Sequence, residues 1–447
     1  MSKDIRIKRG LSLRLEGEAE KDLVKAPRSK TYAVKPPDFH ALVPKMVVKE
    51  GAKILAGDEI FFSKYTKELR FTSPVSGTLK TIKRGEKRKI MEVIIDADPT
   101  DTYKDFGKMD AAATDAEAVK ERILESGCGA FINQRPYDIV ADPKDTPKAI
   151  FISAVSTGPL APDMGFILKD KIAAFQEGIN ALQKLTPGKV HLGVDDSSAQ
   201  YLKDIKGVEL HHVKGPHPAG NVGIQIHKID PINQGERVWT VRPEDVTIIG
   251  NLFLTGKFIA DRTVAVTGSE SKNRKYFSTT IGAEVADIIE KVEDDVRIIS
   301  GSVLTGDKIA YDQHIGFFSN EVSLIPEGNQ YRAFGWLPFT YNNIHSNSKT
   351  SLSWLFPNRK FKPTTNLNGE ERSLVVTGEM EEVLPMDVYP MQLIKACLAG
   401  DIEKMENLGI YEVAPEDFAL VEYVNTSKME IQDVIRLGLD LMITEVG

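Results

Sequence analysis

Ala149-Ile-Phe-Ile-Ser-Ala-Val155 is a short apolar run, and it decides the fold because of the pattern that follows it. Residues 163–185 place their apolar side chains on one helical face, and Val190-His-Leu-Gly-Val194 forms a second apolar run. A short helical stretch over residues 197–205 and a third run, Val208-Glu-Leu-His-His212, continue the alternation. Strand, helix, strand, helix and strand in succession predict a parallel sheet with right-handed crossovers.

We therefore expect residues 101–256 to form a Rossmann-like α/β domain, with Val246-Thr-Ile-Ile249 as a fourth strand. Its first helix should be capped by Thr114 and stop at Gly127. The first strand leads into Ser156-Thr-Gly-Pro-Leu-Ala-Pro162, whereas a dinucleotide site needs the glycines of G-x-G-x-x-G beside the pyrophosphate. One glycine and two prolines do not supply that loop, so we do not expect this domain to bind NAD(H) or flavin.

Residues 1–100 alternate short apolar runs with turn signals, which is typical of an all-β module. The order of Lys49-Glu-Gly51 and Ser73-Pro-Val-Ser-Gly-Thr-Leu79 resembles the barrel-sandwich hybrid of biotinyl and lipoyl carrier domains. Those carriers hold their prosthetic group on a lysine at a hairpin tip. Lys64 and Lys67 have no Met-Lys or Asp-Lys context, so we expect a structural module with no covalently bound cofactor.

The remainder of the chain predicts three further regions. Residues 257–345 are rich in short strands with one helix over 282–291, which suits a small ubiquitin-like (SLBB-type) α+β module. Residues 346–385 are expected to be a linker or loop region. Residues 386–447 predict a helical domain in which Asp401 is an N-cap.

Composition narrows the class of protein. The apolar fraction of 41% and the charged fraction of 27% suit an ordered chain, and 447 residues are enough for several domains. Two cysteines exclude a disulfide scaffold and a cysteine-ligated iron–sulfur cluster. The sequence contains no apolar segment of about 20 residues, so we expect no membrane-spanning helix. We also expect no signal peptide.

Charge is distributed unevenly along the chain. Residues 1–95 contain 22 Lys and Arg against 12 Asp and Glu, although the net charge of the whole chain is −7. The excess is either ordinary solvated surface or a face for an anionic phospholipid surface or acidic protein. The basic residues are not interleaved with stacking aromatic side chains, so we expect no nucleic acid partner.

Four of the eight histidines lie in residues 211–227, here called the histidine segment, together with three glycines and two prolines. Imidazole suits zinc, iron or copper, but the spacing H-H-x4-H-x9-H matches no standard zinc pattern. His211 and His212 point to opposite faces if their strand is regular. We therefore expect no bound metal. The histidines are expected either to form hydrogen bonds within the fold or to line a ligand pocket that contains no metal.

Other candidate sites are weaker. Cys128 is expected to be a packed small residue rather than a nucleophile, and we assign no catalytic residue. Asp195 and Asp196 follow the second strand and suit either a ligand or a helix cap, of which we favour the cap. An aromatic set between Tyr331 and Phe356 suits either core packing or a surface for quinone or a membrane partner. The candidate quinone or ligand pocket comprises Gly215, His217, Pro218, Gly220, His227, Phe334 and Trp336.

Three longer stretches carry a resemblance to a known family. They are Gly215-Pro-His-Pro-Ala-Gly-Asn-Val-Gly-Ile-Gln-Ile-His227, Ser300-Gly-Ser-Val-Leu-Thr-Gly306 and Asn320-Glu-Val-Ser-Leu-Ile-Pro-Glu-Gly328. With Thr157-Gly-Pro-Leu-Ala-Pro162 and Glu382-Val-Leu-Pro-Met-Asp-Val-Tyr-Pro390, they occur in the order found in the A subunits of Na+-translocating NADH:quinone oxidoreductases. The chain resembles that family over nearly its whole length.

The resemblance implies a peripheral subunit on the cytoplasmic face of the bacterial inner membrane, within a six-subunit complex of integral-membrane and redox partners. Such a complex is a translocase that couples electron transfer from NADH to ubiquinone with sodium export. NAD, FMN or FAD and iron–sulfur centres are expected on the partner subunits, and the isolated chain is not expected to catalyse the reaction. The alternative is a soluble redox enzyme that binds its own flavin or nucleotide in the Rossmann-like domain.

Overall fold

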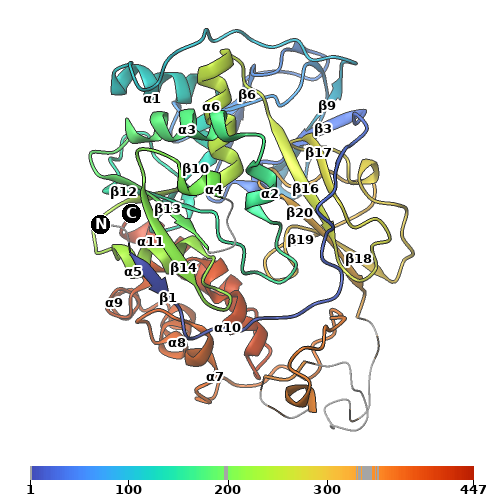
Figure 1. The fold of residues 1–447 in the computed structure, drawn as a ribbon, viewed down its shortest axis with the longest axis vertical. Coiled ribbons are helices and arrows are strands. Elements are labelled where there is room, and N and C mark those ends of the chain that lie inside the picture. Colours follow the sequence, from blue (N-terminus) through green and yellow to red (C-terminus); the bar gives the residue numbers. More distant parts are fainter. Residues whose placement is uncertain are drawn as a thin grey trace.

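A computed structural model describes residues 3–195, 200–328, 330, 334, 345–347, 349 and 352–447. The described chain folds into four β-sheets flanked by helices, followed by a C-terminal group of helices (Figure 1). Among these residues, none of the helices has the length and apolar character needed to cross a bilayer.

The seven-stranded sheet is the centre of the α/β region, with strand order β1-β14-β13-β12-β15-β10-β11. Neighbours from β1 to β15 pair in parallel, whereas β10 pairs antiparallel with β15 and with β11. Its strands are β1 (Asp4–Arg6), β10 (Ile132–Arg135), β11 (Ile139–Val140), β12 (Ala149–Ser153), β13 (Lys189–Val194), β14 (Glu209–Lys214) and β15 (Val238–Val241). The surrounding helices are α1 (Ala116–Glu125), η3 (Cys128–Phe131), α2 (Met164–Leu168), α3 (Ile172–Gln183), α4 (Gln200–Lys203), α5 (Val222–Ile229) and α6 (Pro243–Thr255).

The predicted parallel strands and crossover helices are confirmed, but one element is wrong. Residues 246–249, predicted as the fourth strand, lie inside helix α6, and the fourth strand is β15. Val246, Ile248 and Ile249 are buried together with most of α6, so their β-branched run shows no helical period. Pro243 at the start of the helix is the signal that the prediction overlooked.

Two helix boundaries also differ from prediction. Residues 163–185 form α2 and α3 rather than one helix, with the break at Lys169-Asp170-Lys171. Lys171 turns inward there to the buried Glu244, 2.6 Å away. The first helix is capped by Asp115, whose side chain accepts a hydrogen bond from the Ala118 backbone, and not by Thr114.

Two small sheets form the N-terminal module. One has the order β3-β9-β8-β5 and the other β4-β6-β7. Phe39, Phe61 and Phe71 pack between them, with ring centroids 4.6–4.9 Å apart. The elements are β3 (Thr31–Val34), η1 (Pro36–Asp38), β4 (Pro44–Met46), β5 (Lys53–Ile54), β6 (Glu59–Ser63), β7 (Arg70–Thr72), β8 (Gly77–Arg84), η2 (Glu86–Arg88) and β9 (Ile90–Ala97).

The six-stranded sheet has the order β19-β18-β20-β16-β17-β2. Its strands are β2 (Leu23–Lys25), β16 (Asp261–Thr267), β17 (Tyr276–Thr280), β18 (Val296–Ser300), β19 (Asp307–Ile309) and β20 (Glu321–Pro326). The helix predicted over residues 282–291 is wrong, because that stretch contains only a short 3-10 turn, η4 (Val285–Asp287). Strands β1 and β2 lie in two other sheets rather than in the module predicted for residues 1–100, and Figure 1 shows this N-terminal chain in dark blue running between them.

The C-terminal helices pack against β1, β14 and α5, sharing one apolar core with Ile5, Val213 and Ile224. They are η5 (Leu352–Leu355), α7 (Glu379–Val383), α8 (Pro390–Ala399), α9 (Ile402–Asn407), η6 (Ile410–Glu412), η7 (Pro415–Phe418), α10 (Ala419–Val424) and α11 (Ile431–Glu445). The predicted N-cap Asp401 is confirmed, since its carboxylate accepts a hydrogen bond from the Lys404 backbone.

Candidate functional site

The histidine segment runs from the second half of β14 into α5, and its loop lies directly against the N-terminal chain. Gly215 has φ +149°, and a Cβ atom there would lie 2.5 Å from the Ile7 carbonyl oxygen. The carbonyl of His217 accepts a hydrogen bond from the Leu11 backbone N–H, at 2.8 Å. Glycine is therefore required at 215 by close backbone approach, and residues 7–11 cover the segment.

His217 joins the segment to the loop that follows β12. Its Nδ1 lies 3.2 Å from the Thr157 hydroxyl, and that hydroxyl accepts the Gly220 backbone N–H at 2.8 Å. The hydroxyl proton is then left to donate to Nδ1, which suits a neutral imidazole. The ring is only 7% exposed, and burial lowers the pKa of His217 to about 4. These hydrogen bonds join the histidine segment to the loop after β12.

His227 binds different partners from His217. It lies on α5, where its Nδ1 is 2.6 Å from Glu412 and its Nε2 accepts the Asp387 backbone N–H at 3.2 Å. Phe334 is 67% exposed, and Trp336 lies outside the described residues. The described residues of the predicted pocket therefore lie in three separate places: a packed loop, a contact with the C-terminal helices and an exposed aromatic ring. Its role as a quinone pocket stays a prediction.

Sequence reasoning missed the histidine cluster that the sheet does form. One ligand atom each from His191, Glu209 and His211 lie within 4.8 Å of one another. His191 and Glu209 are register partners on β13 and β14, so their proximity depends on strand pairing and is invisible in the spacing of the histidine segment. His211 is fully buried and His212 partly exposed, as opposite faces of a strand require.

Hydrogen bonding within this cluster opposes a metal ion. His211 Nδ1 accepts the Lys3 backbone N–H at 3.1 Å, so the proton of the neutral ring is on Nε2. That Nε2–H points at His191 Nδ1, 2.9 Å away. A metal on Nε2 would require the proton on Nδ1, facing the Lys3 N–H. Burial lowers the pKa of both rings, that of His191 to about 4, which keeps the pair neutral.

We expect purified protein to contain less than ~0.2 zinc or iron ion per chain, because both nitrogens of His211 are already used. Inductively coupled plasma mass spectrometry after dialysis into metal-free buffer measures this content. A near-stoichiometric metal content in the native chain that disappears in His191→Gln would contradict the assignment of the proton to Nε2.

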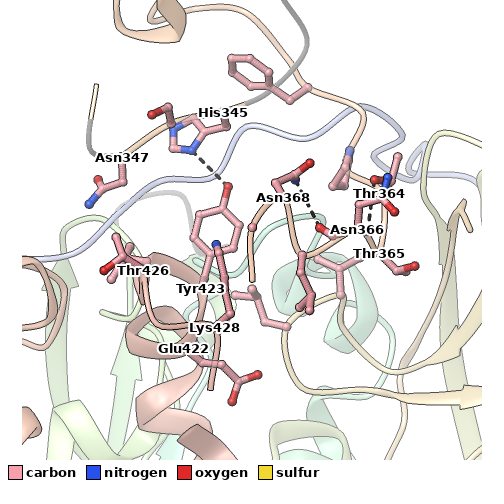
Figure 2. A pocket seen from close by; sticks show the side chains of 18 of the residues that line it. His345, Asn347, Thr364, Thr365, Asn366, Asn368, Glu422, Tyr423, Thr426 and Lys428 are labelled. Atoms are coloured by element: carbon pink, nitrogen blue, oxygen red, sulfur yellow. Dashed lines mark hydrogen bonds between the residues drawn. The ribbon is translucent and has the colours of Figure 1, made fainter. Parts of the chain in front are cut away.

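The large cavity of the described chain lies elsewhere, between the six-stranded sheet, residues 361–372 and α10 (Figure 2). Its volume is about 1120 Å³. None of the described residues of the predicted pocket lines it. Apolar side chains form part of its wall: Leu15, Val303, Leu304, Phe361, Val424 and Met429. Residues 346–385 were predicted only as a linker, so no signal in the sequence pointed to this wall.

Polar side chains face one another across the cavity. His345 Nδ1 and the Tyr423 hydroxyl are 3.1 Å apart, and Figure 2 shows Lys428 beside them on the α10 side. Asn366 and Asn368 lie on the opposite side (Figure 2). Burial lowers the pKa of His345, raises that of Tyr423 and lowers that of Lys428, for which Glu379 opposes the effect. Neutral pH therefore leaves a neutral imidazole and a protonated phenol in the cavity.

The sheet side of the cavity is fixed by Glu327. Its carboxylate binds Arg297 through both oxygens, at 2.5 and 3.0 Å, and accepts hydrogen bonds from Lys308 and Thr365. The hydrogen bond from Arg297 is the largest cause that lowers the pKa of Glu327 to about 2, with burial opposing it. Thr365 is thereby tied to β20, and the loop carrying Asn366 and Asn368 is held against the sheet.

Comparison with known protein families gives a matching domain family for each of the first three predicted regions of the chain. Residues 5–98 match the NqrA N-terminal barrel-sandwich hybrid domain, and residues 114–258 match the NqrA second alpha/beta domain. Residues 263–310 match the NQRA C-terminal domain, of SLBB type. The barrel-sandwich, α/β and SLBB domain types of the sequence analysis are thereby confirmed, while their bounds stay predictions.

Similar proteins match over almost the full chain. The A subunit of the Na(+)-translocating NADH-quinone reductase of Saccharophagus degradans is 34% identical over 440 residues, covering 97% of this chain and 98% of its own. The A subunits from Marinomonas sp. and Haemophilus influenzae are also 34% identical, covering 98% of this chain and 99% and 98% of their own. An NAD+-reducing NiFe-hydrogenase chain aligns with a TM-score of 0.40 at 10% identity over 75% of this chain and 61% of its own, which does not establish a shared fold. The near-complete match at 34% identity shows that the chain belongs to the family of A subunits of the Na+-translocating NADH-quinone reductase.

Proposed function

We propose that this chain is the scaffold and quinone-proximal subunit of a sodium-pumping NADH:ubiquinone reductase. It would act within a six-subunit translocase, on the cytoplasmic face of the bacterial inner membrane, beside integral-membrane and redox subunits. NAD, FMN or FAD and iron–sulfur centres would be held by those partners. The isolated chain would not catalyse electron transfer, because the loop of residues 156–162 lacks the glycines of a dinucleotide site.

The cavity between residues 361–372 and α10 is the observation that carries the quinone assignment. A quinone is a flat apolar ring whose two carbonyl oxygens accept hydrogen bonds, and its isoprenoid tail is apolar. Ligand pockets typically combine apolar walls with a few placed polar groups in about 300–1,000 Å³. Here Phe361, Val424 and Met429 supply apolar wall, while Tyr423 and Lys428 supply donors. A volume of about 1120 Å³ accommodates a quinone head and the first part of a tail.

The histidine segment supports the scaffold part of the proposal. The order β14-β13-β12-β15 places a reversal of strand order between β12 and β15, as in a Rossmann-like domain. Ligands of such sheets bind outside the carboxyl ends of the strands at this reversal. Thr157, His217 and Gly220 fill that region with their own hydrogen bonds. We infer a Rossmann-like domain that retains the sheet and has lost the nucleotide site.

The alternative function, a soluble enzyme that binds its own flavin or nucleotide, predicts a bound cofactor at the carboxyl ends of β12 and β15. A bound flavin would give purified protein a yellow colour with an absorption band at about 450 nm. Under the scaffold proposal, purified chain is colourless and does not retain NADH on gel filtration.

The assembled complex carrying Lys428→Met should show a KM for ubiquinone raised about 10-fold or more. Loss of a hydrogen bond from a charged donor costs about 1.5–3 kcal/mol, and Lys428 is the cation beside Tyr423 in the cavity. Steady-state quinone reduction measures this effect. NADH oxidation by an artificial one-electron acceptor should stay unchanged, because that reaction bypasses the quinone.

Lys404→Met is the matched control, since Lys404 is an exposed lysine of the same helical region and does not line the cavity. It should leave the KM for ubiquinone unchanged. A Lys428→Met complex with unchanged KM, or an equal change in both variants, would contradict a quinone site in this cavity.

A further inference from the structure

One segment of the chain combines exposed apolar side chains with an unusual charge. Residues 328–369 contain five Lys and Arg and no Asp or Glu over 42 residues. The whole chain has 64 Asp and Glu in 447 residues, so about six would be expected in a segment of this length. This acid-free segment therefore carries local positive charge within an acidic protein.

The segment presents three consecutive large apolar side chains to solvent. Trp354, Leu355 and Phe356, here called the apolar tip, are 53%, 49% and 57% exposed. They follow one another in and just after η5, which has no buried residue. Scattered single apolar side chains are ordinary on a surface, but a contiguous apolar patch marks an interaction site. The apolar tip requires a partner that accepts aromatic side chains.

The apolar tip is held in place by its own base. Phe361 is buried, and its backbone pairs with Arg14 and Glu16 at 2.9 Å on both sides. The Ser346 N–H donates to the Ser353 hydroxyl at 3.0 Å, which closes the loop on its other side. The fixed base keeps the tip projecting from the fold, in the orange part of the chain at the lower end of Figure 1. A segment that is already held in its binding conformation loses little conformational entropy when it binds a partner.

Basic residues flank the apolar tip in the sequence. Lys349, Arg359, Lys360 and Lys362 are all exposed. Lys360 pairs with Glu18 at 3.1 Å and Lys362 with Glu270 at 3.9 Å, while the Arg359 guanidinium lies 5.9 Å from the Phe361 ring. Exposed pairs of this kind are weak and exchange readily with another anion. Positive charge next to Trp and Phe is the pattern of side chains that enter the headgroup region of an anionic bilayer.

We propose that the apolar tip inserts into the headgroup region of an anionic lipid bilayer, with Lys349 and Arg359 binding lipid phosphates. The lipid surface is favoured over a protein partner because the segment itself contributes only basic charges and the apolar residues are a short protruding row rather than a groove. This proposal goes beyond the quinone site and rests on different observations. Vesicle binding can fail while the quinone proposal stands, and the reverse.

The basic hairpin of the N-terminal module provides the internal comparison. Lys87 and Arg88 are exposed between β8 and β9, in the sequence Lys83-Arg-Gly-Glu-Lys-Arg-Lys89. Residues 83–89 contain five Lys and Arg, as many as the acid-free segment, but the two strands and their turn, residues 77–97, contain no aromatic residue. Attraction by charge alone would favour the hairpin, whereas insertion favours the apolar tip.

The test uses the full chain and vesicles of phosphatidylcholine with or without phosphatidylglycerol. We expect binding to the anionic vesicles and quenching of tryptophan fluorescence by brominated lipid. Trp354→Ser with Phe356→Ser should weaken partitioning at least about 10-fold, because burial of a Trp or Phe side chain is the larger part of the attraction. Lys349→Glu with Arg359→Glu should weaken it about 10-fold and reduce its dependence on salt.

Lys87→Glu with Arg88→Glu is the matched control and should change partitioning less than about 2-fold. All these positions are exposed, and thermal unfolding of each variant confirms that it is folded. Absence of binding to anionic vesicles at low salt, unchanged partitioning in the apolar-tip variant, or a loss confined to the hairpin variant would each overturn the proposal.

Discussion

Asp417→Asn is expected to lower the free energy of unfolding by about 3–5 kcal/mol, because it removes one partner of a buried ion pair. Arg135 is 1% exposed and Asp417 is 0% exposed. Their Nη1 and Oδ2 atoms are 2.7 Å apart. Neutralising the carboxylate leaves the guanidinium buried with only the partly exposed Glu416, 2.5 Å away. Arg135 Nη1 then loses its buried charged acceptor, and breaking a buried pair costs more than losing a surface pair.

The pair matters because it joins two regions of the chain. Arg135 ends β10 of the seven-stranded sheet, and Asp417 lies in η7 of the C-terminal helices. The first turn of α5 is pressed against them, since a Cβ at Gly223 would lie 2.5 Å from both Arg135 Nη1 and Asp417 Oδ2. Loss of the pair is therefore expected to loosen the C-terminal helices from the sheet.

Urea unfolding at neutral pH measures the change. Lys80→Ala is the control, because Lys80 and Asp96 form an exposed pair whose removal should cost less than about 1 kcal/mol. If Asp417→Asn and Lys80→Ala lowered stability equally, the buried pair would contribute no more than a surface one. That result would contradict its role in joining the two regions.

Acidification from pH 7 to pH 5 is expected to cost the native chain about 2 kcal/mol through His217 alone. Burial lowers the pKa of His217 from 6.5 to about 4 in the folded chain. The unfolded chain therefore takes up a proton as the pH falls through 6.5, whereas the folded site stays neutral until about pH 4. The stabilisation is complete above the unfolded pKa and is lost between these two values.

His217→Gln isolates this contribution from the carboxylates that also titrate in acid. Its stability at pH 7 depends on how well glutamine packs beside Thr157, so the informative quantity is the difference between pH 7 and pH 5. That difference, measured by urea unfolding, should be about 2 kcal/mol smaller in His217→Gln than in the native chain. Equal differences would mean that folding does not lower the pKa of His217.

The sequence pattern correctly predicted those helices and strands that are determined by neighbouring residues in the chain. The strands at 149–155 and 190–194 are apolar runs between turn signals, and Asp401 caps its helix through its own side chain. The run at 246–249 failed because a helix buried on all sides shows no period. Strands β1 and β2 are three residues each, and their partners lie more than 200 residues away. No local pattern announces such a pairing.

In the candidate site, too, local features could be predicted from the sequence and long-range contacts could not. Gly215 and Gly220 were recognised because glycine marks close backbone approach, and both are in tight contact. The pairing of His191 with His211 depends on the register of two strands. The cavity depends on residues from Leu15 to Glu430 converging, and its loop carries only an Asn- and Thr-rich sequence. Long-range convergence of this kind can be seen only in the folded chain.

Photolabelling of the assembled complex with an azido-ubiquinone tests the central claim most directly. Peptide mapping should place the label within residues 345–347, 361–372 or 419–430 of this chain, which contribute the wall of the cavity. Excess unmodified ubiquinone should abolish it, and Lys428→Met should reduce it about 10-fold. Label confined to a membrane partner, with none on this chain, would contradict a quinone-proximal role and leave the chain as a scaffold alone.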